Sequence, residues 1–502
     1  MARAYHLAID IGAGSGRAIS GWLENGVMRM EELHRFTTDD MVLHGQHVRN
    51  VYRWQEEIAF ALGKFASNHN ALESMGVDAM GEDFALIDAQ GNLLKMPPAY
   101  RDVSVDSKVL EIEEARYGNL RLYEVCGNQS VNNDTLRQLI KLGLEKDSVL
   151  DRAAGLLFFG DLFHFFLCGS RAVEHSLASY GKLFSQKNQA WDDSIFSAFG
   201  LPAGLKAPVV RCGARLGKVY RSLWEGAGLS KAPEIVAPAT HDSACAAFAA
   251  MPSERTVFIS SGSWSIIGIK TDEPILTEAA WRFNCSNSSM PLRANMFKKL
   301  VAGAWVIQRC QREWAKYSFS QIESLARRAR ENRFFFNLDD PALFNPRSMT
   351  QTLSEFAGRQ GVALEPDDVG AMARAVFESQ ALKYRFTIEK LKDISGRRIE
   401  DIRIVGGGSR NALVNQFTAN ACGLPVSTGV EEASAAGNLL SQMAGCGEIS
   451  GEAEAREILT RSFEQKYFEP QDRDAWEGKY ARFVEITGEK LDPASDIQTK
   501  EI

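Results

Sequence analysis

The chain has 502 residues and a formal net charge of −7, with 45% hydrophobic and 24% charged residues. These values are typical of a soluble globular protein with two or more domains, and the acidic balance disfavours a nucleic-acid partner. The eight cysteines contain no CxxC pair, which excludes a zinc cluster or disulfide framework of the usual spacing and fits a reducing cytoplasm. The start, "MARAYHLAID", lacks the pattern of a signal peptide, and the most apolar run, 155–167, is shorter than the about 20 residues of a membrane span. We therefore expect a cytoplasmic protein with no membrane partner.

The N-terminal third alternates predicted strands with a helix. The helix is expected at 52–68, where every third or fourth residue is apolar, and its buried face comprises Trp54, Ile58, Ala61, Leu62 and Phe65. The predicted strands are "YHLAIDI" (5–11), "RAISGWL" (17–23), "VMRMEEL" (27–33), "SMGVDAM" (74–80) and "FALIDA" (84–89). This alternation predicts an α/β fold.

The first strand leads from Asp10 into a glycine turn, "GAGSG" (12–16). The turn is not a dinucleotide fingerprint, because the glycines are spaced G-x-G-x-G and because Asn25-Gly26 predicts a hairpin where that fold needs a helix. It also lacks the Gly-Lys-Ser/Thr of a Walker loop. Its backbone N–H groups could form an anion nest, with Asp10 holding Mg²⁺ and Arg17 touching a phosphate. The alternative is a plain hairpin in which Asp10 caps the turn.

The rest of the chain repeats the layout of strand and glycine turn. Residues 105–230 are rich in helix and aromatics, and a strand, turn and helix of small residues follow at 231–251. "TVFISSGSWSIIGIK" (256–270) predicts strand, turn and strand, as residues 4–26 do, and a strong helix is expected at 367–386. A third glycine turn, "VGGGSRN", opens the last predicted helix. This echo suggests that each half of the chain uses the same opening element.

Seven segments in order resemble the FGGY family of carbohydrate kinases, within the superfamily of actin, hexokinase and heat-shock chaperone ATPases. They are "IDIGAGSGR", "MGEDFALIDAQGN", "PPAYRD", "ATHDSACAAFA", "FISSGSWSIIG", "AGAWVIQR" and "IVGGGSRNALVNQFTANACG", which span residues 9–423. Within the family, "GAGSGR" and "THDSA" followed by "SSGSWS" are most similar to the L-rhamnulokinase branch.

The resemblance implies two actin-like (ribonuclease H-like) α/β ATPase domains flanking a deep cleft. We expect a mainly sugar-binding domain at 1–231, a mainly ATP-binding domain at 232–485 and a tail at 486–502. The implied activity is transfer of the γ-phosphate of ATP, with Mg²⁺, to a hydroxyl, expected to be O1, of L-rhamnulose or a related deoxy or short-chain ketose. The expected partners are therefore the sugar and ATP, for a monomer or homodimer.

The resemblance also assigns residues. Asp242 corresponds to the general base that takes the proton of the sugar hydroxyl; the alternative is that it caps the helix that follows it. Asp10 corresponds to the Mg²⁺ residue. The sugar-contacting positions are Gly81, Glu82, Asp83, His241 and Ser243. The nucleotide-contacting positions are Ala13, Gly14, Ser15, Gly16, Arg17, Gly262, Ser263, Gln308, Gly406, Gly407 and Gly408.

Two places on the sugar side depart from the rhamnulokinase pattern. That branch reads Trp-Gly-Val-Asp where this chain has Met80-Gly81-Glu82-Asp83, and it carries asparagine where this chain has Leu300. With Met80 in place of tryptophan, the chain lacks a flat aromatic ring on which a sugar could stack, whereas Glu82 adds a carboxylate that could accept hydrogen bonds from sugar hydroxyls. Because polar pockets discriminate strongly between ligands, the substrate could differ from L-rhamnulose.

Other features are expected to carry no chemistry. His44 and His47 lack the further ligands of a metal site, Cys245 is predicted to be a small buried residue, and the Lys298-Lys299 pair is predicted to lie on a solvated face. Two other functions compete with the kinase: a sugar-independent actin-like ATPase with a regulatory or chaperone-like role, and a dehydrogenase. The sugar-side segments argue against the first, and the hairpin argues against the second.

Overall fold

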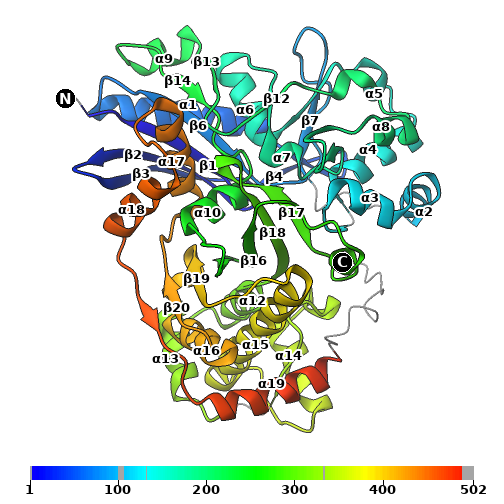
Figure 1. The fold of residues 1–502 in the computed structure, drawn as a ribbon, viewed down its shortest axis with the longest axis vertical. Helices are drawn as coiled ribbons and strands as arrows, with labels where there is room; N and C mark the ends of the chain where they lie inside the picture. Colours follow the sequence, from blue (N-terminus) through cyan, green and yellow to red (C-terminus); the bar gives the residue numbers. More distant parts are fainter. Residues whose placement is uncertain (1–2, 100–106, 132, 332–333, 489–502) are drawn as a thin grey trace.

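The structure is a computed structural model that describes residues 3–99, 107–131, 133–331 and 334–488. Figure 1 shows two α/β halves, one above the other, with α10 (Asp242–Ala250) and α17 (Ala433–Cys446) near their junction. Arg101 and Asp102 of "PPAYRD", and residues 489–502 of the predicted tail, lie outside the described residues.

The N-terminal half is built on a six-stranded sheet in the order β13-β14-β6-β1-β2-β3. The strands β1, β2 and β3 form an antiparallel meander, β6 and β14 continue parallel to β1, and β13 is antiparallel. The bounds are β1 (His6–Ile11), β2 (Ser15–Glu24), β3 (Val27–Thr37), β6 (Ser74–Ala79), β13 (Arg215–Lys218) and β14 (Glu234–Val236).

The C-terminal half is built on a seven-stranded sheet in the order β17-β18-β16-β15-β19-β20-β21. Here β15, β16 and β18 are antiparallel, and β19 and β20 continue parallel to β15. The topology therefore repeats that of the first sheet, which confirms the internal echo. The bounds are β15 (Thr256–Ser261), β16 (Trp264–Thr271), β17 (Ser286–Ser289), β18 (Asn295–Ala302), β19 (Asp401–Val405), β20 (Val426–Thr428) and β21 (Tyr467–Phe468).

Helices and short two-stranded sheets surround the two main sheets. Those of the N-terminal half are α1 (Val51–Asn68), α2 (Ser107–Arg116), α3 (Asn119–Cys126), α4 (Thr135–Leu144), α5 (Val149–Arg152), α6 (Phe159–Cys168), α7 (His175–Ala178), α8 (Asp193–Phe199) and α9 (Arg221–Ala227), with the strand pairs β4 (Asp40–Leu43) and β5 (Gln46–Arg49), β7 (Phe84–Ile87) and β8 (Gly155–Phe158), β9 (Val173–Glu174) and β12 (Val209–Val210), and β10 (Phe184–Ser185) and β11 (Ala190–Trp191). Those of the C-terminal half are α11 (Glu278–Arg282), α12 (Trp305–Trp314), α13 (Phe319–Arg328), α14 (Met349–Arg359), α15 (Val369–Ser395), α16 (Ala412–Cys422), α18 (Glu452–Ser462) and α19 (Arg473–Thr487).

The sequence patterns predicted the main elements. The hairpin turn between β2 and β3 has positive φ at both Asn25 (54°) and Gly26 (73°), as its sequence requires. All five residues on the predicted face of α1 are buried. The helix predicted at 367–386 is α15, which continues to Ser395 and is buried around much of its circumference, because it packs on β16 and on several other helices.

The two halves share a third hydrophobic cluster between their own cores. It joins Ala8 and Ile19 of the first sheet to Phe258 and Val405 of the second through the apolar residues of α10 and α17. The two helices touch backbone to backbone, since a Cβ at Gly437 would lie 2.0 Å from the carbonyl oxygen of Cys245. The small residues of α10 therefore allow a close contact that positions its first residue, Asp242.

The N-terminal sheet does not end at residue 231. Strand β14 pairs with β6, and α17 and α18 from the C-terminal part of the chain pack against β1, β3 and β6, as Figure 1 shows at the upper left. The domain boundary at 231/232 stays a prediction. None of the helices within the described residues is long and apolar enough to cross a membrane.

We expect Gly437→Ala to lower the free energy of unfolding by about 1–3 kcal/mol, because the new methyl group overpacks the contact with α10. Urea and thermal unfolding measure the change. Gly478→Ala is the matched control, since Gly478 is also helical and its added Cβ meets nothing within 4 Å; this change should raise the free energy of unfolding by about 0.5–1 kcal/mol. Equal stability of Gly437→Ala and the wild type would contradict the backbone contact.

Candidate active site

Three segments converge where the parallel strands of the first sheet end. Asp10 lies beside Asp78 in the register of β1 and β6, and the glycine turn follows β1 directly. The N–H of Met80 donates to the carbonyl of Ile11 (3.0 Å), and the N–H of Ala79 donates to the carbonyl of Thr240 (2.8 Å). The glycine turn, the "MGED" loop and the "THDS" loop are therefore held together at the carboxyl edge of the sheet.

Asp242 is the first residue of α10, and His241 occupies the N-cap position. The alternative that Asp242 is the helix cap is therefore wrong. Its Oδ1 accepts hydrogen bonds from the N–H (2.5 Å) and Oγ (3.0 Å) of Ser243. Burial raises the pKa of Asp242 to about 6, although these hydrogen bonds and the charge of Lys298 oppose the shift. A carboxylate with this pKa is ionised at neutral pH and is a stronger base than an exposed one.

A second pair of carboxyl groups lies beside this base. Burial and the neighbouring charge of Asp10 raise the pKa of Asp78 well above its ordinary value, so Asp78 holds a proton. The Oδ2 of Asp78 accepts from Asn438 (2.7 Å), whereas Asp10 lies 3.7 Å from the guanidinium of Arg17. Burial raises the pKa of Asp10 as well, to about 7, although the charge of Arg17 opposes this shift, so Asp10 is the more readily ionised member of the pair. Sequence reasoning missed Asp78, although the apolar strand "SMGVDAM" contains a single acidic residue.

The phosphate-loop candidates form the turn between β1 and β2. The N–H of Gly12 donates to the carbonyl of Ser15 (3.1 Å), and Ala13 and Gly14 lie at the tip. Gly16 is needed for packing, because a Cβ there would lie 2.1 Å from the ring of Phe36. The guanidinium of Arg17 donates to Glu432, which lies at the start of α17.

The other two glycine turns meet on the second sheet, because β15 pairs in parallel with β19. Ser263 donates its hydroxyl hydrogen bond to Oε1 of Gln308 (2.7 Å), so two residues far apart in sequence come together. Gly408 packs against Ser261, whose Oγ would be 2.0 Å from an added Cβ, and Gly406 has a positive φ of 82°. Gly262 and Gly407 are exposed.

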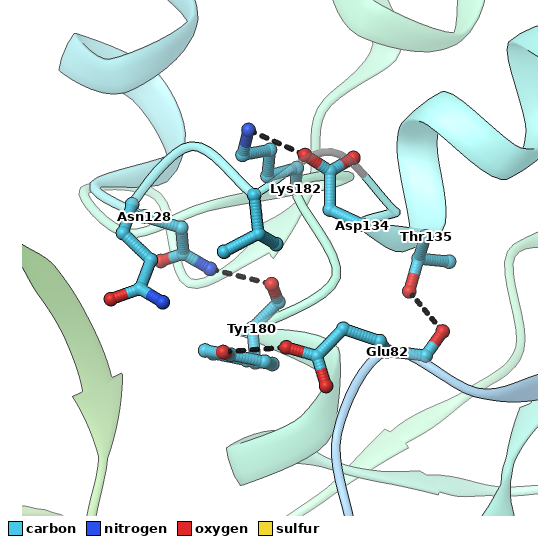
Figure 2. Close-up of a pocket in the computed structure, with 8 residues that line it drawn as sticks. Glu82, Asn128, Asp134, Thr135, Tyr180 and Lys182 are labelled. Atoms are coloured by element: carbon cyan, nitrogen blue, oxygen red, sulfur yellow. Dashed lines mark hydrogen bonds and ion pairs between the residues drawn. The ribbon is translucent and has the colours of Figure 1, made fainter. Parts of the chain in front are cut away.

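The sugar-side candidates surround Tyr180. Its hydroxyl donates a hydrogen bond to Oε1 of Glu82 (2.8 Å). Its ring leaves no room for a side chain at Gly81, because a Cβ there would lie 2.6 Å from the ring. Burial raises the pKa of Glu82 to about 7. Asp83 is buried and pairs with Nε of Arg49 (2.9 Å). Figure 2 shows the small polar pocket beside Glu82 and Tyr180, lined also by Asn128, Asp134, Thr135 and Lys182.

His241 and Ser243 flank the base from either side. Nε2 of His241 lies 3.7 Å from Oδ1 of Asp242, and its ring centroid lies 4.7 Å from that of Tyr180. Burial and the charge of Lys298 lower the pKa of His241 well below its ordinary value, so the imidazole is neutral. It can therefore serve as a hydrogen-bonding group without adding charge beside Asp242.

The prediction of a solvated face for the Lys298-Lys299 pair is wrong. Lys298 is 4% exposed and lies over the ring of Tyr180, whereas Lys299 donates to the carbonyl oxygen of Phe283 (2.6 Å). Both residues belong to β18, and consecutive residues of a strand point to opposite faces. A predicted strand at this place would have separated the two lysines.

Two discounted features are a histidine pair and a buried cysteine. His44 and His47 belong to the β4–β5 hairpin, and no group of three or more His, Cys, Asp or Glu side chains in the described part of the chain is arranged to hold a metal ion. Cys245 is buried, and its Sγ contacts the carbonyl oxygen of Ala239 (3.0 Å).

Two sheets of one repeated topology, with glycine turns at their edges and a half-buried carboxylate at the start of α10, define a carbohydrate kinase of the actin-like ATPase fold. The model of the FGGY family of carbohydrate kinases, N-terminal domain, matches residues 5–249, and that of its C-terminal domain matches residues 257–446. The chain belongs to this family. It is a phosphotransferase with an alcohol group as acceptor, and the family implies ATP as co-substrate.

Curated relatives and solved structures agree with this assignment. The chain is 33% identical to a rhamnulokinase of Bacteroides thetaiotaomicron over 95% of its length and 98% of the relative's. It is 31% identical to a rhamnulokinase of Halalkalibacterium halodurans over 94% and 100%. The fold matches gluconate kinase from Lactobacillus acidophilus with a TM-score of 0.81 at 13% identity, covering 99% of each chain. It matches Plasmodium falciparum glycerol kinase with ADP with a TM-score of 0.76 at 13% identity, covering 97% and 99%.

The neighbours Gly407 and Gly408 provide a test of the third turn. We expect Gly408→Ala to lower the free energy of unfolding by about 1–3 kcal/mol, because the methyl group meets Ser261. Gly407→Ala should change it by less than about 0.5 kcal/mol, because nothing lies within 4 Å of the added Cβ. Urea unfolding of both variants checks this pair, and equal effects would contradict the packing of this turn against β15.

Proposed function

We propose that the chain transfers the γ-phosphate of ATP to O1 of a ketose, with Asp242 as general base. The observation that carries this proposal is the placement of Asp242. It is half-buried at the start of α10, has a pKa raised to about 6, and lies beside the sugar-side candidates His241 and Glu82. Asp242 accepts the proton of the sugar hydroxyl as the oxygen attacks the phosphorus, while the surrounding residues hold the reactants in line.

The nucleotide is assigned to the three glycine turns. Ala13, Gly14, Ser15, Gly16 and Arg17 contact its phosphates through backbone N–H groups and a guanidinium. Gly262, Ser263 and Gln308 contact the nucleotide from the second turn, and Gly406, Gly407 and Gly408 pack against the adenosine. Because Gly407→Ala is expected to leave the fold intact, weaker binding of ATP by this variant in calorimetry would support the contact.

The residues present fit a magnesium ion. Asp10 lies at the end of β1, and its carboxyl oxygens are the kind of ligand that Mg²⁺ takes from one or two carboxylates, together with waters and phosphate oxygens. The protonated Asp78 holds the carboxyl group of Asp10 in place. When bound, the ion would neutralise charge on the phosphates of ATP.

The ketose is L-rhamnulose or a related deoxy or short-chain ketose. Support comes from the rhamnulokinase relatives, whereas Met80, Glu82 and Leu300 differ from that pattern. An ADP-release assay with L-rhamnulose, L-fuculose, L- and D-ribulose, xylulose and erythrulose identifies the substrate. Inactivity on all of them, with ATP binding intact, would contradict the proposed acceptor class. A cytoplasmic location and a monomeric or dimeric state stay predictions.

We expect Asp242→Asn to lower sugar-dependent ADP release by about 10²–10⁴-fold, the usual contribution of a general base. The asparagine Oδ1 can still accept the hydrogen bonds of Ser243, so folding and ATP binding should be retained. Thermal unfolding and calorimetry with ATP provide these controls. A variant with a near wild-type rate would show that Asp242 is not the base.

The raised pKa of Asp242 predicts the acid side of the pH profile. A base acts only when ionised, so kcat/KM for the sugar at saturating Mg-ATP should fall as pH drops through about 6. Ser243→Ala removes the side-chain hydrogen bond that lowers this pKa, and the acid limb should therefore move to higher pH. A limb that stays in place in Ser243→Ala would assign it to another group.

A further inference from the structure

Lys298 comes from the second sheet but faces the candidate residues of the first half. It lies in β18, where it pairs with Gly268 of β16, and it is 4% exposed. Its Nζ lies 4.9 Å from the ring centroid of Tyr180, whose hydroxyl donates a hydrogen bond to Glu82. No hydrogen bond or ion pair reaches this ammonium from any residue that the structure describes.

Two carboxylates lie close enough to the ammonium to influence its pKa, but neither forms an ion pair with it. Burial lowers the pKa of Lys298 to about 8, whereas the charges of Asp242 and Glu82 act to raise it. A buried ammonium carries three donors and is unfavourable without acceptors. The face of the Tyr180 ring provides a cation–π contact, but it does not satisfy the three donors of the ammonium with hydrogen-bond acceptors. The position therefore suits an oxygen atom of a ligand that enters near Asp242 and Glu82.

Glu82 has acceptor capacity of its own. Its Oε1 is used by Tyr180, and Figure 2 shows the second carboxylate oxygen pointing away from this hydroxyl. Its backbone is fixed as well, because its carbonyl oxygen accepts from Thr135 (3.0 Å) and Gln138 (3.2 Å). The carboxylate is thus presented in one orientation.

We propose that Lys298 donates a hydrogen bond to the C2 carbonyl oxygen of a ketose. Asp242 accepts a hydrogen bond from the 1-hydroxyl, and Glu82 accepts one from the 3-hydroxyl. The three groups form a sequence of acceptor, donor and acceptor, in which the ammonium can only donate and the carboxylates, once ionised, can only accept. The first three carbons of a ketose present the complementary sequence of donor, acceptor and donor. This assignment rests on the proposed kinase function with Asp242 as the base, and it makes Lys298 and Glu82 determinants of specificity.

The proposal predicts discrimination between a ketose and the alditol of the same length. In an alditol, a tetrahedral 2-hydroxyl replaces the planar carbonyl, so the oxygen moves out of the carbonyl plane and its proton needs an acceptor that the ammonium cannot provide. Sites built to bind one polar group reject analogues that do not match it. The wild type should therefore have a clearly higher kcat/KM for the ketose of a pair such as D-xylulose and xylitol, or erythrulose and erythritol.

Lys298→Met tests the contact, because methionine has a similar shape without charge or donors. We expect a 10- to 100-fold loss of kcat/KM for the best ketose, mainly as a higher KM, which corresponds to one lost charged hydrogen bond. The KM for ATP and the rate with the alditol should change by less than about threefold, so the preference for the ketose collapses.

The pH profile provides a second test. In the wild type, kcat/KM for the ketose should fall above pH 8, where Lys298 loses its proton beside Asp242, Glu82, Tyr180 and His241. The pH profile of Lys298→Met should lack this fall at alkaline pH.

Lys299→Met is the matched control, since it removes the neighbouring ammonium on the opposite face of β18. It should leave the ratio of ketose to alditol unchanged, even if the lost bond to Phe283 lowers the unfolding temperature. If Lys298→Met does not fold, Lys298→Gln, which keeps a donor, is measured in its place, and it should retain part of the ketose preference.

The outcomes separate this inference from the proposed function. A wild-type preference for ketoses that survives unchanged in Lys298→Met would overturn the carbonyl contact and leave the kinase intact. Equal losses for ketose and alditol, or for sugar and ATP, would also overturn it, because they indicate a structural role. Inactivity of the wild type on the whole sugar panel would contradict the proposed function itself.

Discussion

The close contact between α10 and α17 is the constraint on which the arrangement of the site depends. Gly437 lets the two helices meet at the backbone of Cys245, between the two sheets. The next residue of α17, Asn438, donates to Asp78, and Gln442 one turn later donates to the carbonyl of Leu7 and accepts from Ser74. One helix therefore fixes both the start of α10 and the strands β1 and β6 that present the carboxylates. Because these polar groups are buried, each lost partner would be costly, and the network holds a single register.

Charge at the site is divided between the two halves of the molecule. The first half contributes Asp10, Asp78, Asp242 and Glu82, and burial raises the pKa of each. The second half contributes Lys298 across the junction. A site enclosed by both halves would exclude water and strengthen each of these interactions. The proposed base and the ammonium therefore depend on both halves of the molecule, as expected for an enzyme that must keep water from the γ-phosphate.

The sequence predicted the repeated elements better than the side chains around the substrate. Strand periodicity, the Asn25-Gly26 turn and the glycine turns depend on local chemistry, so they could be recognised from residues a few positions apart. The family resemblance assigned Ser263 and Gln308 to the nucleotide, and the structure brings them together. Asp78, Tyr180 and Lys298 could not be assigned from local patterns, because their partners lie 98 or more residues away in the sequence. The Lys298-Lys299 pair suggests one solvated surface, but a strand turns neighbouring residues to opposite faces.

The proposed nucleotide and sugar sites differ in the groups that they offer to a ligand: mainly backbone groups in the first and side chains in the second. On the proposed nucleotide side, the glycine turns offer mainly backbone groups, and Gly16 and Gly408 are fixed by packing against Phe36 and Ser261. A methyl group added at either of these two glycines disturbs the fold itself. On the proposed sugar side, Glu82 and Lys298 present side chains that extend from an already fixed backbone. Substitutions at these positions can therefore change the acceptor while the phosphate donor and the base keep their geometry, which is how one kinase scaffold can serve sugars of different shape.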